Sequence, residues 1–504
     1  MTSPFQLIQE FNKEEKHHFK LFVKNSTSKK DTKLNSFLTL IYNGHTSKVI
    51  CEELYGTYPN MAFYALRKRL SHLLLEYYAN YRDKEIDAAQ KDIQLHFEAG
   101  KKLVLNKKYK LGFECLNKAL NKSEHNDFTE LTEKIIFELI QFAHLNSDLD
   151  LEKLMLKHKS LKKIELKQKS IAIIYARVKQ EMNTYFKKSN SAEVLLKIEE
   201  LFSSQNISID RDLNYRALYQ LAQLTFAAST VSRTFLADLN NFEKRIERIV
   251  KAKQPKNSGQ WTFKFKLFYL LSTANYRAKK FKQSNDYLNR ILKLSRTKRV
   301  ALSYEFHFKI VVLKSLNINY LGENKQAFEV LNELLKTSKL PKSNKNWMDG
   351  FGVMSMILFH GKKYSSILKL YHDFKKSDKQ FTEINGLEWV LRKNLILILT
   401  HFELGNIEIS EELIGRFEFE NQRFLSENQR VLFFLICIQK VVSNPFQAKN
   451  SHLHRFVEYK LEKKPRYEED IFVLSFFAWL KAKMLGEDVY ELTIEIVKNL
   501  GNEI

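Results

Sequence analysis

The histidines of this sequence are the first residues to consider for chemistry, because histidine is the commonest metal ligand in proteins. Zinc hydrolases place two histidines one helical turn apart, with a glutamate as general base. The nearest candidates are His17 with His18 and His452 with His454, and neither pair has that geometry. We therefore expect ordinary surface or core histidines and predict no metal-binding residue.

Other arrangements that support catalysis or cofactor binding are also missing. The cysteines Cys51, Cys115 and Cys437 are far apart, so we expect buried free thiols and no zinc site, redox dithiol or marked nucleophile. None of the 14 glycines forms a phosphate-cradling loop, and no Gly-x-Ser-x-Gly elbow occurs. The sequence predicts no catalytic residue, no cofactor and no enzyme activity. Catalytic residues that converge from distant repeats would carry no such motif, so this prediction rests on motifs alone.

The positive charge of the chain suggests a class of ligand. Its formal net charge is +24, and a surface rich in lysine and arginine attracts nucleic acid by releasing counterions from phosphates. The excess is mostly lysine and accompanies abundant Asn, Ile and Phe, a mixture that AT-rich codon usage also produces. Lysine keeps exposed helix faces in solution as well. We favour a general solvated surface over a phosphate-binding one, and both interpretations stay open.

The elements that carry these residues are predicted to be long helices. Apolar residues make up 44% of the 504 residues, which is enough for a folded core. Only 14 Gly and 6 Pro occur, too few for the turns of a large β-sandwich or the loops of an α/β enzyme. Because the length exceeds what one core usually serves, we expect several domains or a repeat array.

An internal repeat is the strongest pattern in the sequence. The segments 106–120, 278–292 and 321–335 each contain a short polar or glycine-containing turn, then an apolar stripe with Leu-Asn at the same place. Similar helix breaks recur at intervals of 38 to 49 residues. They are expected near residues 109, 148, 189, 232, 281, 324, 364, 407, 445 and 487. The pattern predicts helical hairpins that bury their apolar faces against one another.

The order of first helix, turn and second helix resembles the tetratricopeptide repeat. A small residue precedes the turn and an aromatic residue follows it, and Tyr276, Phe281 and Tyr287 occupy such places. The period near 42 is longer than the 34 residues of that family, so longer helices or a HEAT-like repeat would be needed. The resemblance implies an all-α fold in which residues 86–504 form a right-handed α-solenoid of about ten helical hairpins.

Residues 1–85 lie outside the repeat and are predicted to form a small helical N-terminal domain. Its helices are expected around residues 5–23, 34–42, 46–55 and 61–81. A short helix, a turn with glycine and a longer helix is the order of a helix-turn-helix. Residues 65–74 are also similar to the last helix of winged-helix regulators.

That similarity implies a set of nucleic-acid-binding residues. Those that would face a DNA groove or its phosphates are Lys48, Asn60, Tyr64, Arg67, Lys68 and Arg69. The alternative is an amphipathic capping unit, because the terminal unit of a solenoid must cover the end of the stack. We favour the capping unit, since no β-wing is recognisable after the last helix and the acidic Glu52 and Glu53 oppose a phosphate backbone.

Two functions follow as hypotheses. The favoured one is a non-catalytic protein–protein interaction scaffold, whose inner helices form a concave groove for another protein or peptide of acidic character. The alternative is a DNA-binding transcription regulator that uses residues 34–81, while the array senses a signal or forms a dimer. The N-terminus lacks a signal-peptide pattern and the apolar runs are too short to cross a bilayer, so we expect a cytoplasmic protein without a membrane partner.

Overall fold

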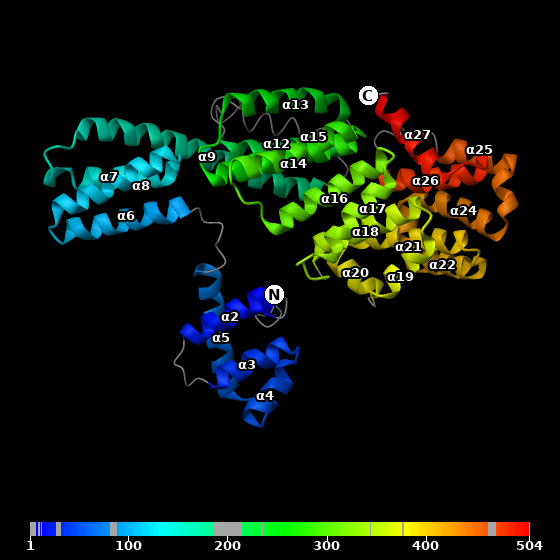
Figure 1. Ribbon diagram of the computed structural model, residues 1–504, viewed down its shortest axis with the longest axis horizontal. Helices are drawn as coiled ribbons and strands as arrows, with labels where there is room; N and C mark the ends of the chain where they lie inside the picture. Colours follow the sequence, from blue (N-terminus) through cyan, green and yellow to red (C-terminus); the bar gives the residue numbers. More distant parts are fainter. Residues whose placement is uncertain are drawn as a thin grey trace. The chain divides into compact units, whose positions relative to one another are not determined.

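The protein, seen in a computed structural model, is all-helical over the residues that are described. These are residues 7–8, 11, 13–26, 32–80, 88–185, 214–232, 235–342, 344–374, 377–461 and 470–502. They form α-helices and two short 3-10 helices, with no β-strand among them (Figure 1). The predicted all-α fold class is therefore confirmed. No helix in this part of the chain is both long and apolar enough to cross a bilayer.

Two compact units divide the chain, one of residues 1–122 with 338–341 and one of residues 123–337 with 342–504. The helices that begin in the first unit are α2 (Lys13–Ser26), α3 (Thr32–Tyr42), α4 (Ser47–Tyr55), α5 (Met61–Asn80), α6 (Ala88–Leu105) and α7 (Tyr109–His125). The domain boundary predicted near residue 85 stays a prediction.

Helices α2 to α5 share one apolar core. Phe19, Phe37 and Phe63 come from α2, α3 and α5 and are almost completely buried in it. The rings of Phe37 and Phe63 meet edge to face, with their centroids 5.5 Å apart. The helices expected near 34–42, 46–55 and 61–81 are present as α3, α4 and α5.

The second unit contains the remaining helices, most of them arranged as hairpins. They are α8 (Thr129–Gln141), η1 (Ala143–Leu145), α9 (Leu151–Tyr185), α12 (Tyr215–Ser232), α13 (Phe235–Ala252), α14 (Ser258–Arg277), α15 (Phe281–Thr297), α16 (Tyr304–Tyr320), α17 (Asn324–Lys336), α18 (Lys345–His360), α19 (Tyr364–His372), α20 (Asp378–Asn385), α21 (Leu387–Glu403), α22 (Ile407–Glu420), α23 (Gln422–Glu427), α24 (Gln429–Ser443), η2 (Pro445–Lys449), α25 (Ser451–Leu461), α26 (Ile471–Leu485) and α27 (Val489–Asn502). Every helix break predicted from the repeat falls at or between helix ends, except the one near residue 189, which lies outside the described residues.

The turns of successive hairpins have the same backbone geometry. The second residue after the first helix has a positive φ at Lys279 (60°), Gly322 (99°), Lys362 (55°) and Gly405 (78°). At each turn two N–H groups return to the last helical turn; for example, the Lys362 N–H donates to the Phe359 carbonyl at 3.1 Å. This is the left-handed helix cap that closes the exposed carbonyls of a helix end. The shared cap explains why polar and glycine-containing turns recur along the sequence.

In two hairpins a serine hydroxyl bonds to a backbone carbonyl of the facing helix, between residues twelve positions apart. The Ser272 hydroxyl of α14 donates to the Ser284 carbonyl of α15 at 3.0 Å, and both side chains are fully buried. In α22, the Ser410 hydroxyl donates to the Ile398 carbonyl of α21 at 3.1 Å. A larger side chain at Ser272 or Ser410 would push these helices apart.

The first helices of consecutive hairpins contact one another in chain order. Helix α12 contacts α14, α14 contacts α16, α16 contacts α18, and α18 contacts α21 (Figure 1). The second helices α15 and α17 each contact the first helix that follows them. Each apolar stripe is therefore covered partly by its own hairpin and partly by the next one.

The last hairpin, α26 with α27, packs back onto helices far away in the sequence. The Tyr490 hydroxyl donates to the Asn319 carbonyl at the end of α16, at 2.5 Å. The Trp479 indole N–H donates to Glu403 at the end of α21, at 2.6 Å. An array in which each hairpin contacts only its neighbours does not predict these contacts.

Two glycine-to-alanine substitutions, one in a turn and one inside a helix, are expected to change the free energy of unfolding in opposite directions. Gly405→Ala places a Cβ in open space but forces a left-handed residue, so we expect a loss of about 1–2 kcal/mol in the free energy of unfolding. Gly415 lies on the exposed face of α22 and has ordinary helical backbone angles. We therefore expect Gly415→Ala to raise the free energy of unfolding by up to about 1 kcal/mol. Urea unfolding of both variants measures this. Equal stability of Gly405→Ala and the wild-type protein would show that the turn is not left-handed.

Candidate functional site

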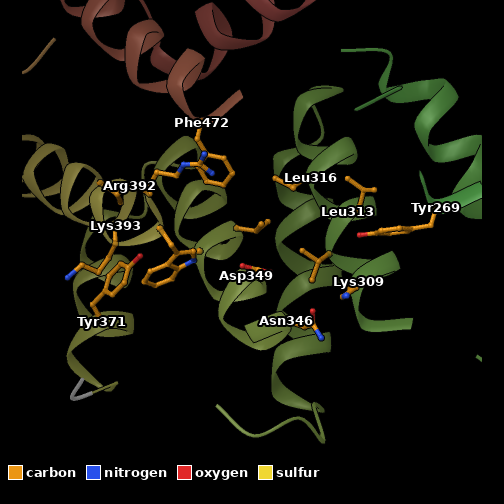
Figure 2. Close-up of a pocket in the computed structure, with 15 residues that line it drawn as sticks. Tyr269, Lys309, Leu313, Leu316, Asn346, Asp349, Tyr371, Arg392, Lys393 and Phe472 are labelled. Carbon is orange, nitrogen blue, oxygen red and sulfur yellow. The ribbon is translucent and has the colours of Figure 1, made fainter. Parts of the chain in front are cut away.

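A cavity of about 350 Å³ opens between the first helices α14, α16, α18 and α21, with one side chain each from α19 and α26 (Figure 2). Its volume lies within the range of sites that hold small ligands or a few peptide residues. The floor is formed by the buried apolar side chains of Val312, Leu313, Leu316, Val353 and Ile396. Figure 2 shows Tyr269 entering from α14 on one side, and Tyr371, Arg392 and Lys393 on the opposite side.

Polar groups on α16 and α18 also line the cavity. Lys309 is exposed on α16, and Asn346 and Asp349 lie in the first two turns of α18 (Figure 2). Asp349 is the one carboxylate among the lining residues, against the three cations Lys309, Arg392 and Lys393. The lining therefore carries an excess of positive charge, which favours an acidic ligand.

The carboxylate of Asp349 is held by its surroundings. Its Oδ1 accepts a hydrogen bond from the Asn385 side chain at 2.8 Å. The surrounding protein raises the pKa of the Asp349 carboxyl above its usual range, and the positive charges of Lys345 and Lys309 oppose that rise. Asp349 thus loses its charge at a higher pH than an ordinary aspartate.

Two of the three cations already have carboxylate partners. Lys393 is only 8% exposed, and its ammonium group pairs with Asp378. The Arg392 guanidinium lies 3.6 Å from Asp470 at the start of α26, and 5.3 Å from the Phe472 ring. These pairs fix the shape of the cavity wall, and Lys309 is left as the cation most accessible to a ligand.

A glycine in α18 makes room for the indole of Trp389 at the cavity. A Cβ added to Gly352 would lie 3.0 Å from Trp389 Nε1, closer than side chains usually approach. Trp389 continues an aromatic cluster with Phe381 and Phe351, at centroid distances of 5.3 and 6.4 Å. Glycine inside a helix lowers helix stability by about 1 kcal/mol relative to alanine, and at Gly352 it leaves the space that the Trp389 indole occupies.

None of these cavity residues was predicted individually from the sequence. The repeat pattern predicts a concave groove lined by inner helices, but it does not identify the side chains of that groove. Gly350 and Gly352 inside an otherwise apolar helix were the available signal, because two glycines two residues apart weaken a helix unless a neighbour approaches closely.

The predicted nucleic-acid-binding residues on and next to α5 differ in their exposure to solvent and in their local role. The Asn60 side chain caps the helix, accepting the Ala62 N–H at 2.9 Å. Tyr64 is partly exposed, Arg67 is half-buried, and Lys68 is exposed. Asn60, Tyr64 and Lys68 follow one another at intervals of one helical turn and so lie on one face.

The other two predicted contacts lie apart from that face. Arg69 is exposed on α5, but as the next residue after Lys68 it points about 100° away from Lys68 around the helix axis. Lys48 is exposed on α4, and the same helix exposes Glu52 and Glu53. The acidic pair weakens the positive character of this surface.

The three cysteines are free thiols in different surroundings. Cys51 and Cys437 are buried free thiols as expected, whereas Cys115 is half-buried. Within the described residues, no three His, Cys, Asp or Glu side chains are grouped so as to hold a metal ion.

Comparison with known proteins does not assign the chain to a family. No protein-family model matches the chain, and no curated protein matches its sequence. Function must therefore be inferred from the site.

Replacing Asp349 with asparagine tests the electrostatics of the cavity. A carboxyl whose pKa is raised by folding lowers stability at pH values above that pKa, and the loss disappears as the pH falls below the unfolded-state pKa. We expect Asp349→Asn to be slightly more stable than wild type at pH 7, by less than about 1 kcal/mol because the group reaches solvent, and equally stable at pH 3. Urea unfolding at both pH values measures the difference. A variant that is less stable at pH 7 would show instead that the carboxylate stabilises the cavity.

Proposed function

We propose that the protein is a non-catalytic scaffold that binds an acidic segment of another protein. In this proposal its helical hairpins form a right-handed α-solenoid of about ten repeats, similar to tetratricopeptide arrays, which acts in the cytoplasm. The cavity between α14, α16, α18 and α21 is the observation that carries the proposal. It combines an apolar floor, where a bulky side chain can be buried, with a positively charged rim.

The lining chemistry supports a peptide more than a reacting substrate. Asn346 and the Trp389 indole supply hydrogen-bond donors to which peptide carbonyl groups can bind. The titratable lining groups Lys393 and Arg392 are already engaged in ion pairs that hold the wall. Lys309, on the exposed rim, is placed to meet a carboxylate of the ligand.

Selection from a random peptide library tests this proposal. We expect the full chain to enrich peptides with a net negative charge and at least one bulky apolar residue. Lys309→Glu should weaken the binding of an enriched peptide about tenfold, measured by fluorescence anisotropy, because it reverses the most accessible charge of the rim.

Lys325→Glu is the matched control, because it makes the same change in charge on α17, outside the cavity lining. This variant should bind like the wild-type protein. A library that yields no peptide, or an equal loss in both variants, would reject binding at the cavity.

A DNA-binding transcription regulator is the second candidate, with the array as sensor or dimerisation domain. It is supported by the exposed Lys48, Lys68 and Arg69 on two helices joined by a short connection. It is opposed by the exposed Glu52 and Glu53 on α4.

Binding to a random DNA duplex distinguishes this alternative. If it is correct, affinity should fall steeply with salt, with a logarithmic slope of about 0.9 for each phosphate contact. The double variant Lys48→Glu with Lys68→Glu should then abolish binding, whereas Lys110→Glu with Lys118→Glu, on the exposed face of α7, should retain most of it. If the wild-type protein shows no affinity at low salt, the regulator is excluded.

A further inference from the structure

Lys264 of α14 is a buried cation that forms no ion pair with the residues that the structure describes. Only 5% of the residue is exposed, and no carboxylate or other acceptor among the described residues bonds to its ammonium group. The group lies instead between aromatic rings, with Nζ at 5.0 Å from the centroid of Trp261, 5.8 Å from Tyr215 and 6.0 Å from Phe268. Ring faces offset part of the lost hydration of a cation, but less than an anion would.

Two further cations lie against the same rings. The Arg290 guanidinium is 4.5 Å from the Phe268 centroid, and the Lys298 ammonium is 5.9 Å from the Trp261 centroid. Burial lowers the pKa of Lys264, the positive charges of Arg290 and Lys298 lower it further, and the negative charge of Glu247 opposes part of this fall. Three positive charges therefore lie around the indole of Trp261 and the phenyl ring of Phe268.

The nearby carboxylates do not neutralise this group. Glu247 of α13 accepts from Arg290 Nη1 at 2.5 Å and from the Tyr287 hydroxyl at 3.0 Å, so both hydrogen bonds go to groups other than Lys264. Glu243 accepts from the same Tyr287 hydroxyl at 2.6 Å. The charge of Arg290 is matched by Glu247, and within the described part of the chain no carboxylate forms an ion pair with Lys264 or Lys298.

We propose that Lys264, Lys298 and Arg290 form a binding site for a phosphate group. A phosphate dianion carries the two negative charges that would balance Lys264 and Lys298, and its oxygens can accept from ammonium and guanidinium donors together. Binding removes the repulsion between the cations and supplies the partner that the buried ammonium lacks. Lys264 and the cavity residue Tyr269 lie about 140° apart around α14, so this site is independent of the proposed peptide groove.

Thermal unfolding of the full chain with inorganic phosphate tests the site. At constant ionic strength, millimolar phosphate should raise the unfolding temperature of the wild-type protein by about 1–3 °C relative to chloride. Lys264→Met should abolish the shift and should raise the unfolding temperature in chloride, because it removes a buried unpaired charge. A shift with inorganic phosphate supports the site, and O-phosphoserine in a parallel series shows whether the site also admits a phosphate monoester.

A second variant tests the site even if Lys264→Met fails to fold. Lys298→Gln changes an exposed side chain and should reduce the phosphate shift while leaving stability in chloride unchanged. Lys325→Gln, exposed on α17, is the matched control and should keep the full shift. The proposal is overturned if phosphate gives no shift in the wild-type protein, or if Lys298→Gln and Lys325→Gln respond equally.

Discussion

The close approach of the two helices within a hairpin, seen in α14 with α15 and in α21 with α22, is the constraint on which the second unit depends. At Ser272 and Ser284, and again at Ile398 and Ser410, one serine hydroxyl bonds directly to the carbonyl of the facing helix. Such contact requires a small side chain at Ser272 and Ser410, which meet the facing backbone, since an added methylene in a packed interface displaces backbone. With each pair held at this distance, the first helices of successive hairpins contact one another, and side chains from α14, α16, α18 and α21 reach a common cavity.

The C-terminal hairpin completes that cavity. Asp470, at the start of α26, lies 3.6 Å from the Arg392 guanidinium, and Phe472 forms part of the wall. Trp479, which is fully buried, donates to Glu403 and so ties α26 to the end of α21. The charged groups of the wall therefore take part in holding the hairpins together, and their positions are set before any ligand binds. Such preorganisation reduces the entropy lost on binding.

The sequence predicts the turns well and the cavity poorly, for a physical reason. Breaks near residues 281, 324, 364 and 407 depend on local chemistry, because a left-handed cap follows each first helix regardless of what packs against it. The cavity depends on which faces of four helices converge, and its lining spans positions from Tyr269 to Phe472. Lys264 shows the same limit: charge alone predicts a solvated lysine, whereas hairpin packing buries it among aromatic rings.

Hydrogen exchange with and without a bound acidic peptide tests most directly whether the inner helices form the binding surface. We expect slower exchange in segments from α16, α18 and α21, whose side chains line the cavity, and unchanged exchange in the second helices α17 and α22, which contribute no lining residue. Protection confined to α17 and α22, or to residues 47–80 of the N-terminal unit, would contradict it.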